Sequence, residues 1–264
     1  MPTDLPPDPA VVATLRAGGC VFAEDEAALL LLDRPAPATL DERVRRRVDG
    51  EPIEYVLGWA EFCGHRVTVV PGVFVPRRRT EFLVELAAAV LEEHAAPVVV
   101  DLCCGSGAIG MALGHSRPAA GIHGADIDPV AVACAAVNLA AVGGTAYLSD
   151  LVAGLPPGLR GAVDMIVANA PYVPTDAIAL MPAEARLHEH RVALDGGADG
   201  LDLHRRIAGQ VADWLCPGGR LLIETSEEQA DQTAAAVRGA GLSARIEHDE
   251  DRESTVVIGV MRPR

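Results

Sequence analysis

Four consecutive residues, Asn169-Ala170-Pro171-Tyr172, carry the pattern with the most evident chemical potential in this chain. They follow the aliphatic run 163–168, which predicts a buried strand. In α/β proteins the reactive groups gather at the carboxyl ends of such strands. The four residues are therefore expected to stand at the edge of a sheet that holds a reaction site.

The residue types suit the capture of a planar amide or amine nitrogen. Such a nitrogen has two N–H donors and a delocalised lone pair. The side-chain oxygen of Asn169 and the backbone carbonyl of Ala170 can each accept one of those hydrogen bonds and aim the nitrogen at an electrophile. Pro171 stiffens the loop without adding a donor, and Tyr172 can pack over a flat group. We predict that all four are catalytic and that Asn169 and Tyr172 also bind substrate; a plain turn after a strand is the alternative.

A glycine-rich turn stands upstream of these residues. The aliphatic run 98–102 leads into Gly105, Gly107 and Gly110, with the spacing GxGxxG, and then into a helix. Glycine lets the backbone approach a ligand closely. The pattern alone does not identify the ligand, because NAD, FAD and S-adenosylmethionine sites all use it.

Three acidic residues around this turn favour a cationic cofactor. Asp101 precedes the turn inside the end of the first strand, where it would repel a pyrophosphate but can hold an ammonium or sulfonium group. Asp126 can accept from ribose hydroxyls and Asp150 from an adenine amino group, whereas Asp128 is read as the cap of the helix that begins at Pro129. The cofactor predicted is S-adenosyl-L-methionine, with S-adenosyl-L-homocysteine as product. Its expected contacts are Asp101, Cys103, Gly105, Gly107, Asp126, Ile127, Asp150, Leu151 and Asn169.

The elements that must position these residues are expected to alternate between strands and helices. Strands are expected at 98–102, 121–127, 145–148, 163–168, 220–225, 243–248 and 255–260, with helices at 81–93, 130–142, 201–215 and 227–240. This alternation predicts a doubly wound, Rossmann-like and mostly parallel sheet, and the two last strands, with no helix between them, predict an antiparallel pair. The chain is expected to divide into a helical domain (1–50), a β-hairpin linker (51–79) and the α/β domain (80–264).

Composition limits the possible partners. Asp and Glu number 37 against 22 Lys and Arg, a formal net charge of −15. Because phosphate contacts supply much of the affinity for nucleic acids, this charge makes nucleic acid an unexpected partner. Six cysteines without a CxxC pair, no signal-peptide pattern and no long apolar run indicate a cytoplasmic protein without a membrane span. No metal is expected, since His188-Glu189-His190 lacks a third ligand.

The motifs together resemble the release-factor glutamine methyltransferases, the HemK/PrmC family. The resemblance covers most of the chain from about Gly50 onward. It rests on Val75-Pro-Arg-Arg-Arg-Thr-Glu81, 101–110, Asn169–Tyr172, and the loop 193–201 that follows Glu189.

What this resemblance implies is a class I S-adenosylmethionine-dependent methyltransferase fold with a seven-stranded sheet. It also implies transfer of a methyl group to the side-chain nitrogen N5 of a glutamine, in the Gly-Gly-Gln loop of a class 1 peptide chain release factor. Arg77 and Glu189 would then bind substrate, and the domain 1–50 would dock it.

Several positions depart from the family pattern. Ala170 stands where the family has a proline, which makes the motif Asn-Ala-Pro-Tyr, and Cys103 and Cys104 replace a glycine and a threonine. The alternatives are a paralogue that methylates another protein, or an enzyme that methylates the amino group of adenine (N6) or cytosine (N4) in nucleic acid.

Overall fold

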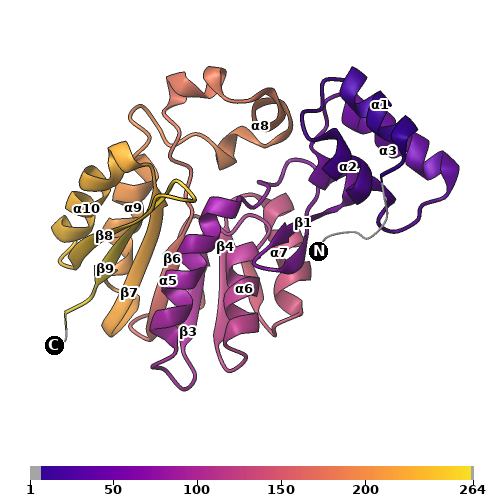
Figure 1. Ribbon diagram of the computed structural model, residues 1–264. Coiled ribbons are helices and arrows are strands. Elements are labelled where there is room, and N and C mark those ends of the chain that lie inside the picture. The colour runs from indigo at the N-terminus through magenta and orange to yellow at the C-terminus, as the bar shows by residue number, and fades with distance from the viewer. Residues whose placement is uncertain (1–6, 263–264) are drawn as a thin grey trace.

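A seven-stranded sheet forms the centre of the protein, for which the computed structural model describes residues 7–262 (Figure 1). From one edge to the other its strands are β5 (Thr145–Leu148), β4 (Gly121–Asp126), β3 (Val98–Leu102), β6 (Val163–Ala168), β7 (Leu215–Thr225), β9 (Ser254–Val260) and β8 (Ser243–Asp249). The first five are parallel, and β9 runs antiparallel to both of its neighbours. The expected fold class is confirmed, including the antiparallel end.

The strand order creates a crevice in the middle of the sheet. From β3 the chain moves outward through β4 to β5, and then returns to the other side of β3 as β6. The connections that follow β3 and β6 therefore leave in opposite directions. In open α/β sheets, ligands bind in the crevice that such a reversal opens at the carboxyl ends of the strands.

Helices cover both faces of the sheet because its central strands are apolar on both faces. Adjacent residues of β3 point to opposite sides, so Val99 joins one core cluster and Val100 the other. The first cluster packs α5 (Glu81–Leu91), α6 (Ala108–Ser116) and α7 (Pro129–Ala140), and the second packs α9 (Asp202–Val211) and α10 (Ala230–Gly239).

The N-terminal part is helical, as expected. It comprises α1 (Pro9–Ala17), α2 (Ala23–Leu31), α3 (Pro37–Val48) and α4 (Ile53–Leu57), whose own small core contains the fully buried Leu15 and Leu30. Arg47 of α3 pairs with Glu26 at 2.7 Å and with Glu184 at 2.7 Å. Glu184 belongs to α8 (Ala183–His188), so this ion pair links the N-terminal helices to α8.

A β-hairpin joins the two parts, formed by β1 (Trp59–Phe62) and β2 (His65–Thr68). The strands of the expected hairpin linker end at Thr68, and residues 73–75 of that linker form no strand. The helices α4 and α8 were not expected, since five or six residues are too few to show a helical period. The strand β7 begins at Leu215 rather than at Arg220. The division of the chain at residues 50 and 79 stays a prediction.

Within the described range 7–262, no helix is long and apolar enough to cross a membrane.

Candidate active site

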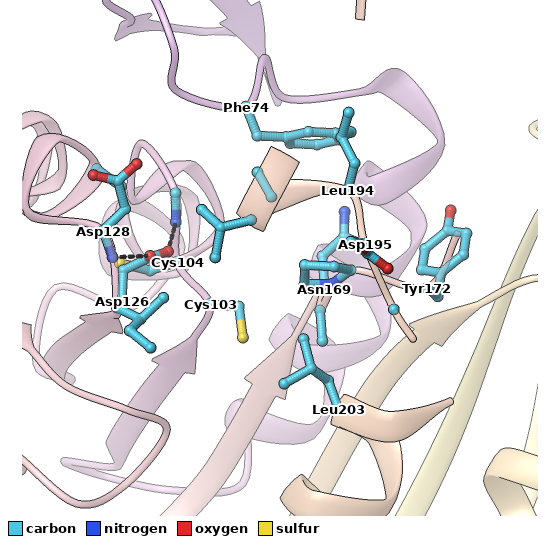
Figure 2. Close-up of a pocket in the computed structure, with 18 of the residues that line it drawn as sticks. Phe74, Cys103, Cys104, Asp126, Asp128, Asn169, Tyr172, Leu194, Asp195 and Leu203 are labelled. Carbon is cyan, nitrogen blue, oxygen red and sulfur yellow. Dashed lines mark hydrogen bonds between the residues drawn. The ribbon is translucent and has the colours of Figure 1, made fainter. Parts of the chain in front are cut away.

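A cavity of about 810 Å³ lies at the carboxyl ends of β3, β4, β5 and β6 (Figure 2). Figure 2 shows Asp126 on one side, Asn169 on the other, and Cys103 between them. Most of the residues expected from the sequence line this cavity: Arg77, Cys103, Gly105, Asp126, Ile127, Asp150, Leu151, Asn169, Ala170, Pro171 and Tyr172. Asp101, Gly107 and Glu189 do not line it.

The glycine turn shapes the floor of the cavity between β3 and α6. Cys103, Gly105 and Gly107 have φ values of 54°, 53° and 75°. Glycine adopts this left-handed region freely, whereas a cysteine there costs about 1–2 kcal/mol. A glycine at position 103, which the resemblance implies as the family's usual residue, would carry no such strain.

Gly107 serves packing and does not line the cavity. A Cβ atom at this position would lie 3.1 Å from Cβ of Ala135 and 3.2 Å from Cγ of Leu139, both in α7. The residue also caps the start of α6. Its lack of a side chain therefore lets α6 and α7 approach one another behind the turn.

Asp126 is fixed at the end of β4 by two backbone donors. Its Oδ2 accepts from the Gly105 N–H at 2.9 Å and its Oδ1 from the Asp128 N–H at 2.9 Å (Figure 2). Burial raises the pKa of Asp126, and these hydrogen bonds oppose the rise in part. A carboxylate offers about four lone-pair sites, so two remain for a ligand's hydroxyl groups. Asp128, by contrast, caps α7 by accepting from Val130, as the sequence predicted.

Asp101 lies behind the turn and is completely buried. Its Oδ2 accepts from the Gly110 N–H at 3.0 Å, whereas Oδ1 has no hydrogen-bond partner among residues 7–262. Burial raises the pKa of Asp101 to about 7. A cation at the turn would favour the charged form of this carboxyl group.

Asp150 lines the cavity but already has a partner. Both of its carboxylate oxygens accept from Arg206 Nη2, at 2.7 and 2.8 Å. No motif in the sequence pointed to Arg206, which arrives from α9, 56 residues further along the chain. The next residue, Leu151, is buried with a φ of 52° and adds apolar surface to the cavity.

The loop from Asn169 to Tyr172 forms the opposite wall. The Asn169 Nδ2 donates to Thr80 Oγ1 at 3.1 Å, and Ala170 is fully buried. The Tyr172 hydroxyl lies 3.5 Å from Glu224 Oε1. Burial and the nearby Glu224 raise the pKa of Tyr172 to about 12, so this phenol stays protonated at neutral pH.

Arg77 and Glu189 come together, but only the arginine faces the cavity. Arg77 Nη2 lies 2.6 Å from Glu189 Oε1, and the Glu189 side chain is 1% exposed. Glu189 Oε1 also accepts from the Val75 N–H at 3.3 Å, and burial raises the pKa of this carboxyl group. The geometry makes Glu189 the support that holds Arg77 at the rim.

Other residues in the cavity wall were missed from the sequence. They include the apolar residues Phe74 and Leu203, and also Leu194 and Asp195, whose loop contributed to the resemblance although neither residue was singled out. Thr80 was seen only as part of the Pro-Arg-Arg-Arg-Thr loop. His190, which drew attention as a metal ligand, instead lies 2.6 Å from Asp128 Oδ2. Residues 7–262 contain no group of three or more His, Cys, Asp or Glu side chains placed to hold a metal ion.

These residues fit S-adenosylmethionine. The cavity has the size of a small-molecule site, and its acidic groups are Asp126, Asp150 and, just behind the turn, the half-satisfied Asp101. Carboxylates in these places suit ribose hydroxyls, an amino group and a cation. Apolar side chains of Ile127, Leu151 and Leu203 offer a surface for a flat ring. When bound, this cofactor supplies an electrophilic methyl group on a sulfonium.

Comparisons with known proteins agree with this chemistry. The family model described as "Methyltransferase small domain" matches residues 64–199. The release factor glutamine methyltransferase of Moorella thermoacetica is 36% identical over 249 residues, covering 87% of this chain and 88% of that one. The 4-amino-L-phenylalanine/4-methylamino-L-phenylalanine methyltransferase of Streptomyces pristinaespiralis is 36% identical over 212 residues, covering 78% and 76%.

A solved structure shows the same fold. The 16S rRNA N2 G1207 methyltransferase of T. thermophilus, in complex with AdoMet and guanosine, aligns with a TM-score of 0.56 and 21% identity, over 77% of this chain and 50% of that one. The fold, the cavity and the sequence relatives lead to one conclusion: the chain belongs to the release factor glutamine methyltransferase family and is an S-adenosylmethionine-dependent methyltransferase.

Proposed function

We propose that this enzyme transfers the methyl group of S-adenosylmethionine to N5 of the glutamine in the Gly-Gly-Gln loop of a class 1 peptide chain release factor. The observation that carries the proposal is the placement of Asn169 and Ala170 in the same cavity as Asp126. The relatives named for release factors, such as that of Moorella thermoacetica, indicate which amide enters.

The side chains of the site provide orientation more than acid–base chemistry. An amide nitrogen is a weak nucleophile because its lone pair is shared with the carbonyl group. Hydrogen bonds from its two N–H groups to Asn169 Oδ1 and the Ala170 carbonyl would hold it in line with the electrophile and increase its electron density. The methyl–sulfur bond breaks as the nitrogen–methyl bond forms, and the proton lost from nitrogen passes to water. Tyr172, protonated at neutral pH, shapes the pocket beside the amide.

The rim and the N-terminal helices would receive the protein substrate. Arg77, held by Glu189, stands at the mouth of the cavity, and residues 1–50 form the docking domain in this proposal. The net charge of −15 argues against a nucleic-acid substrate, because phosphates would be repelled. A release factor acts during translation, so the proposed location is the cytoplasm.

The test is an incubation with methyl-labelled S-adenosylmethionine and a purified class 1 release factor, followed by mass spectrometry of the Gly-Gly-Gln peptide. One added methyl group on the glutamine supports the proposal. The variant Asn169→Ala serves as matched control: it should lose turnover while binding the cofactor as tightly as the wild type in calorimetry. Turnover by Asn169→Ala would remove this side chain from the mechanism.

A second arm uses 4-amino-L-phenylalanine, because one relative is named for this compound. Its aryl amine also has two N–H donors and a delocalised lone pair, so the same two acceptors suit it. Methylation of this amino acid, with no methyl group on the release factor, would overturn the proposed substrate.

A further inference from the structure

The order of the strands along the sheet edge sets the direction in which the cofactor lies. The strands β6, β3, β4 and β5 are successive neighbours, and the cavity residues at or just beyond their carboxyl ends are, in that order, Asn169, Cys103, Asp126 and Asp150. S-adenosylmethionine has its sulfonium methyl group, its ribose and its adenine in a linear order as well. With the methyl group toward Asn169 and the ribose at Asp126, the adenine extends to Asp150.

The carboxylate of Asp150 depends on one partner for its orientation. Arg206 Nη2 donates to its Oδ1 at 2.7 Å and to its Oδ2 at 2.8 Å, and no other hydrogen bond to this side chain occurs within residues 7–262. The Asp150 side chain is 51% exposed, so it would turn freely in water without the guanidinium group. Arg206 therefore decides where the two carboxylate oxygens point.

This ion pair is poorly placed to stabilise the fold. Both side chains are about half exposed, and exposed ion pairs contribute little to folding stability. The pair does, however, lie in the wall of the cavity, where Leu203 also belongs to the lining. Because Leu203 and Arg206 are three residues apart on α9, they lie on one face of that helix. The helix thus presents an apolar side chain and an arginine to the same ligand.

The geometry leaves Asp150 able to accept further hydrogen bonds. A carboxylate has about four lone-pair positions, and Arg206 uses one on each oxygen, so one on each oxygen remains. The amino group at position 6 of adenine is a donor and suits such an acceptor. A purine with an oxo group at position 6 would instead place an acceptor against an acceptor, and a carboxylate held by Arg206 cannot turn away from it.

We propose that Arg206 is a specificity-determining residue for the cofactor. It holds the carboxylate of Asp150 toward the base, and the enzyme thereby selects a purine with an amino group at position 6. Arg206 acts through Asp150 and takes no part in methyl transfer, so it is a positioning residue. The inference concerns the cofactor and does not depend on which acceptor is methylated.

Calorimetry with two ligands tests the proposal. S-adenosyl-L-homocysteine carries the 6-amino group, and S-inosyl-L-homocysteine carries an oxo group in its place. The wild type should bind the adenosyl compound about 30-fold more tightly or better. Arg206→Met keeps an unbranched apolar stem and removes the donors. It should weaken binding of the adenosyl compound about 3- to 10-fold and change the Kd of the inosyl compound less than about 2-fold.

Matched variants separate orientation of Asp150 from other effects. Arg206→Lys keeps a charged donor, and since one nitrogen makes both contacts, its ratio of the two Kd values should stay within about 3-fold of the wild type. Arg205→Met is the control: Arg205 is the neighbouring arginine of α9, pairs with Asp199 and Asp202, and does not line the cavity, so both Kd values should be unchanged.

A double-mutant cycle shows whether Arg206 works through Asp150. Asp150→Ala should lower the ratio of the two Kd values to about 3 or less, and Asp150→Ala/Arg206→Met should bind both ligands as Asp150→Ala does. Additive losses would mean that Arg206 contacts the base directly and would overturn the positioning role.

Two further results would also overturn the inference. One is equal affinity of the wild type for the two ligands, and the other is an equal loss of affinity for both in Arg206→Met, which is the mark of a merely structural residue. No acceptor is present in these measurements. If the ratio depends on Arg206 and the release factor is not methylated, the proposed function fails and the role of Arg206 stands. If the release factor is methylated and the ratio is indifferent to Arg206, this inference fails alone.

Discussion

The ionisation of Asp101 links the stability of the folded protein to pH and can be tested quantitatively. Its pKa rises from an ordinary value of 3.8 to about 7 because the carboxyl group is fully buried, with one hydrogen bond from Gly110 and a nearby charge on Asp126. Between these two pH values the unfolded chain has lost the Asp101 proton, whereas the folded chain retains it. The folded state is therefore destabilised as the pH rises, by about 1.4 kcal/mol per pH unit and at most about 4 kcal/mol in total.

Replacing Asp101 by asparagine removes this penalty. The side-chain oxygen of the new amide can still accept from the Gly110 N–H, and no ionisation takes place. The free energy of unfolding of Asp101→Asn, minus that of the wild type, should therefore increase by about 2 kcal/mol between about pH 5 and pH 7 and level off at about pH 8. The measurement is urea unfolding without cofactor at a series of pH values.

The matched control is Asp195→Asn. Hydrogen bonds from Thr175 and the Gly197 N–H lower the pKa of Asp195. Any stabilisation of the folded state by the ionised Asp195 is therefore complete above its ordinary pKa and is lost only in stronger acid. The free energy of unfolding of Asp195→Asn, minus that of the wild type, should not vary between about pH 5 and pH 8. If the corresponding difference for Asp101→Asn is equally independent of pH over this range, the claim that Asp101 is buried and protonated in the folded state is refuted.

Two further variants, with one control, examine the glycine turn and its acidic partner. Asp126→Ala removes the acceptor for Gly105 and for ribose hydroxyls, and should weaken S-adenosylmethionine binding about 10- to 100-fold in calorimetry, whereas an unchanged Kd would place the ribose elsewhere. Gly107→Ala introduces both a strained φ and a Cβ 3.1 Å from Ala135, so it should cost about 2–4 kcal/mol of unfolding free energy. Gly143→Ala has a similar φ of 70° with nothing within 4 Å, and should cost only about 1–2 kcal/mol; equal losses would show that the close approach of α6 and α7 is unimportant.

The sequence was sufficient to predict the sheet and the edge at which the site lies. Aliphatic runs such as 98–102 and 163–168 predict buried strands, and the residues that follow them must meet because parallel strands end at one edge. This is why Cys103, Asp126 and Asn169 line one cavity, as expected. The antiparallel pairing of β8 and β9 followed similarly from the missing helix between them.

The exact task of each acidic residue could not be predicted, because burial depends on the packing around it. Asp101 and Asp126 both lie within one residue of the carboxyl end of a strand, yet only Asp126 reaches the cavity. Glu189 lies beside histidines in a loop, but its carboxylate turns inward to Arg77, 112 residues earlier in the chain. Sequence spacing carries no information about such long-range ion pairs.

The Ala170 position shows how tertiary contacts replace a local constraint. A proline here would limit the backbone by its ring, and alanine does not. In the structure the neighbouring backbone is restrained from outside: Gln229 Nε2 donates to the Tyr172 carbonyl at 3.0 Å, and Val173 exchanges hydrogen bonds with Leu194 at 3.2 Å and Gly196 at 2.9 Å. Together with Thr80 on Asn169, these partners from distant segments hold the loop on which the proposed orientation of the amide depends. The loop can therefore keep its geometry with alanine because its order comes from the packed fold around it.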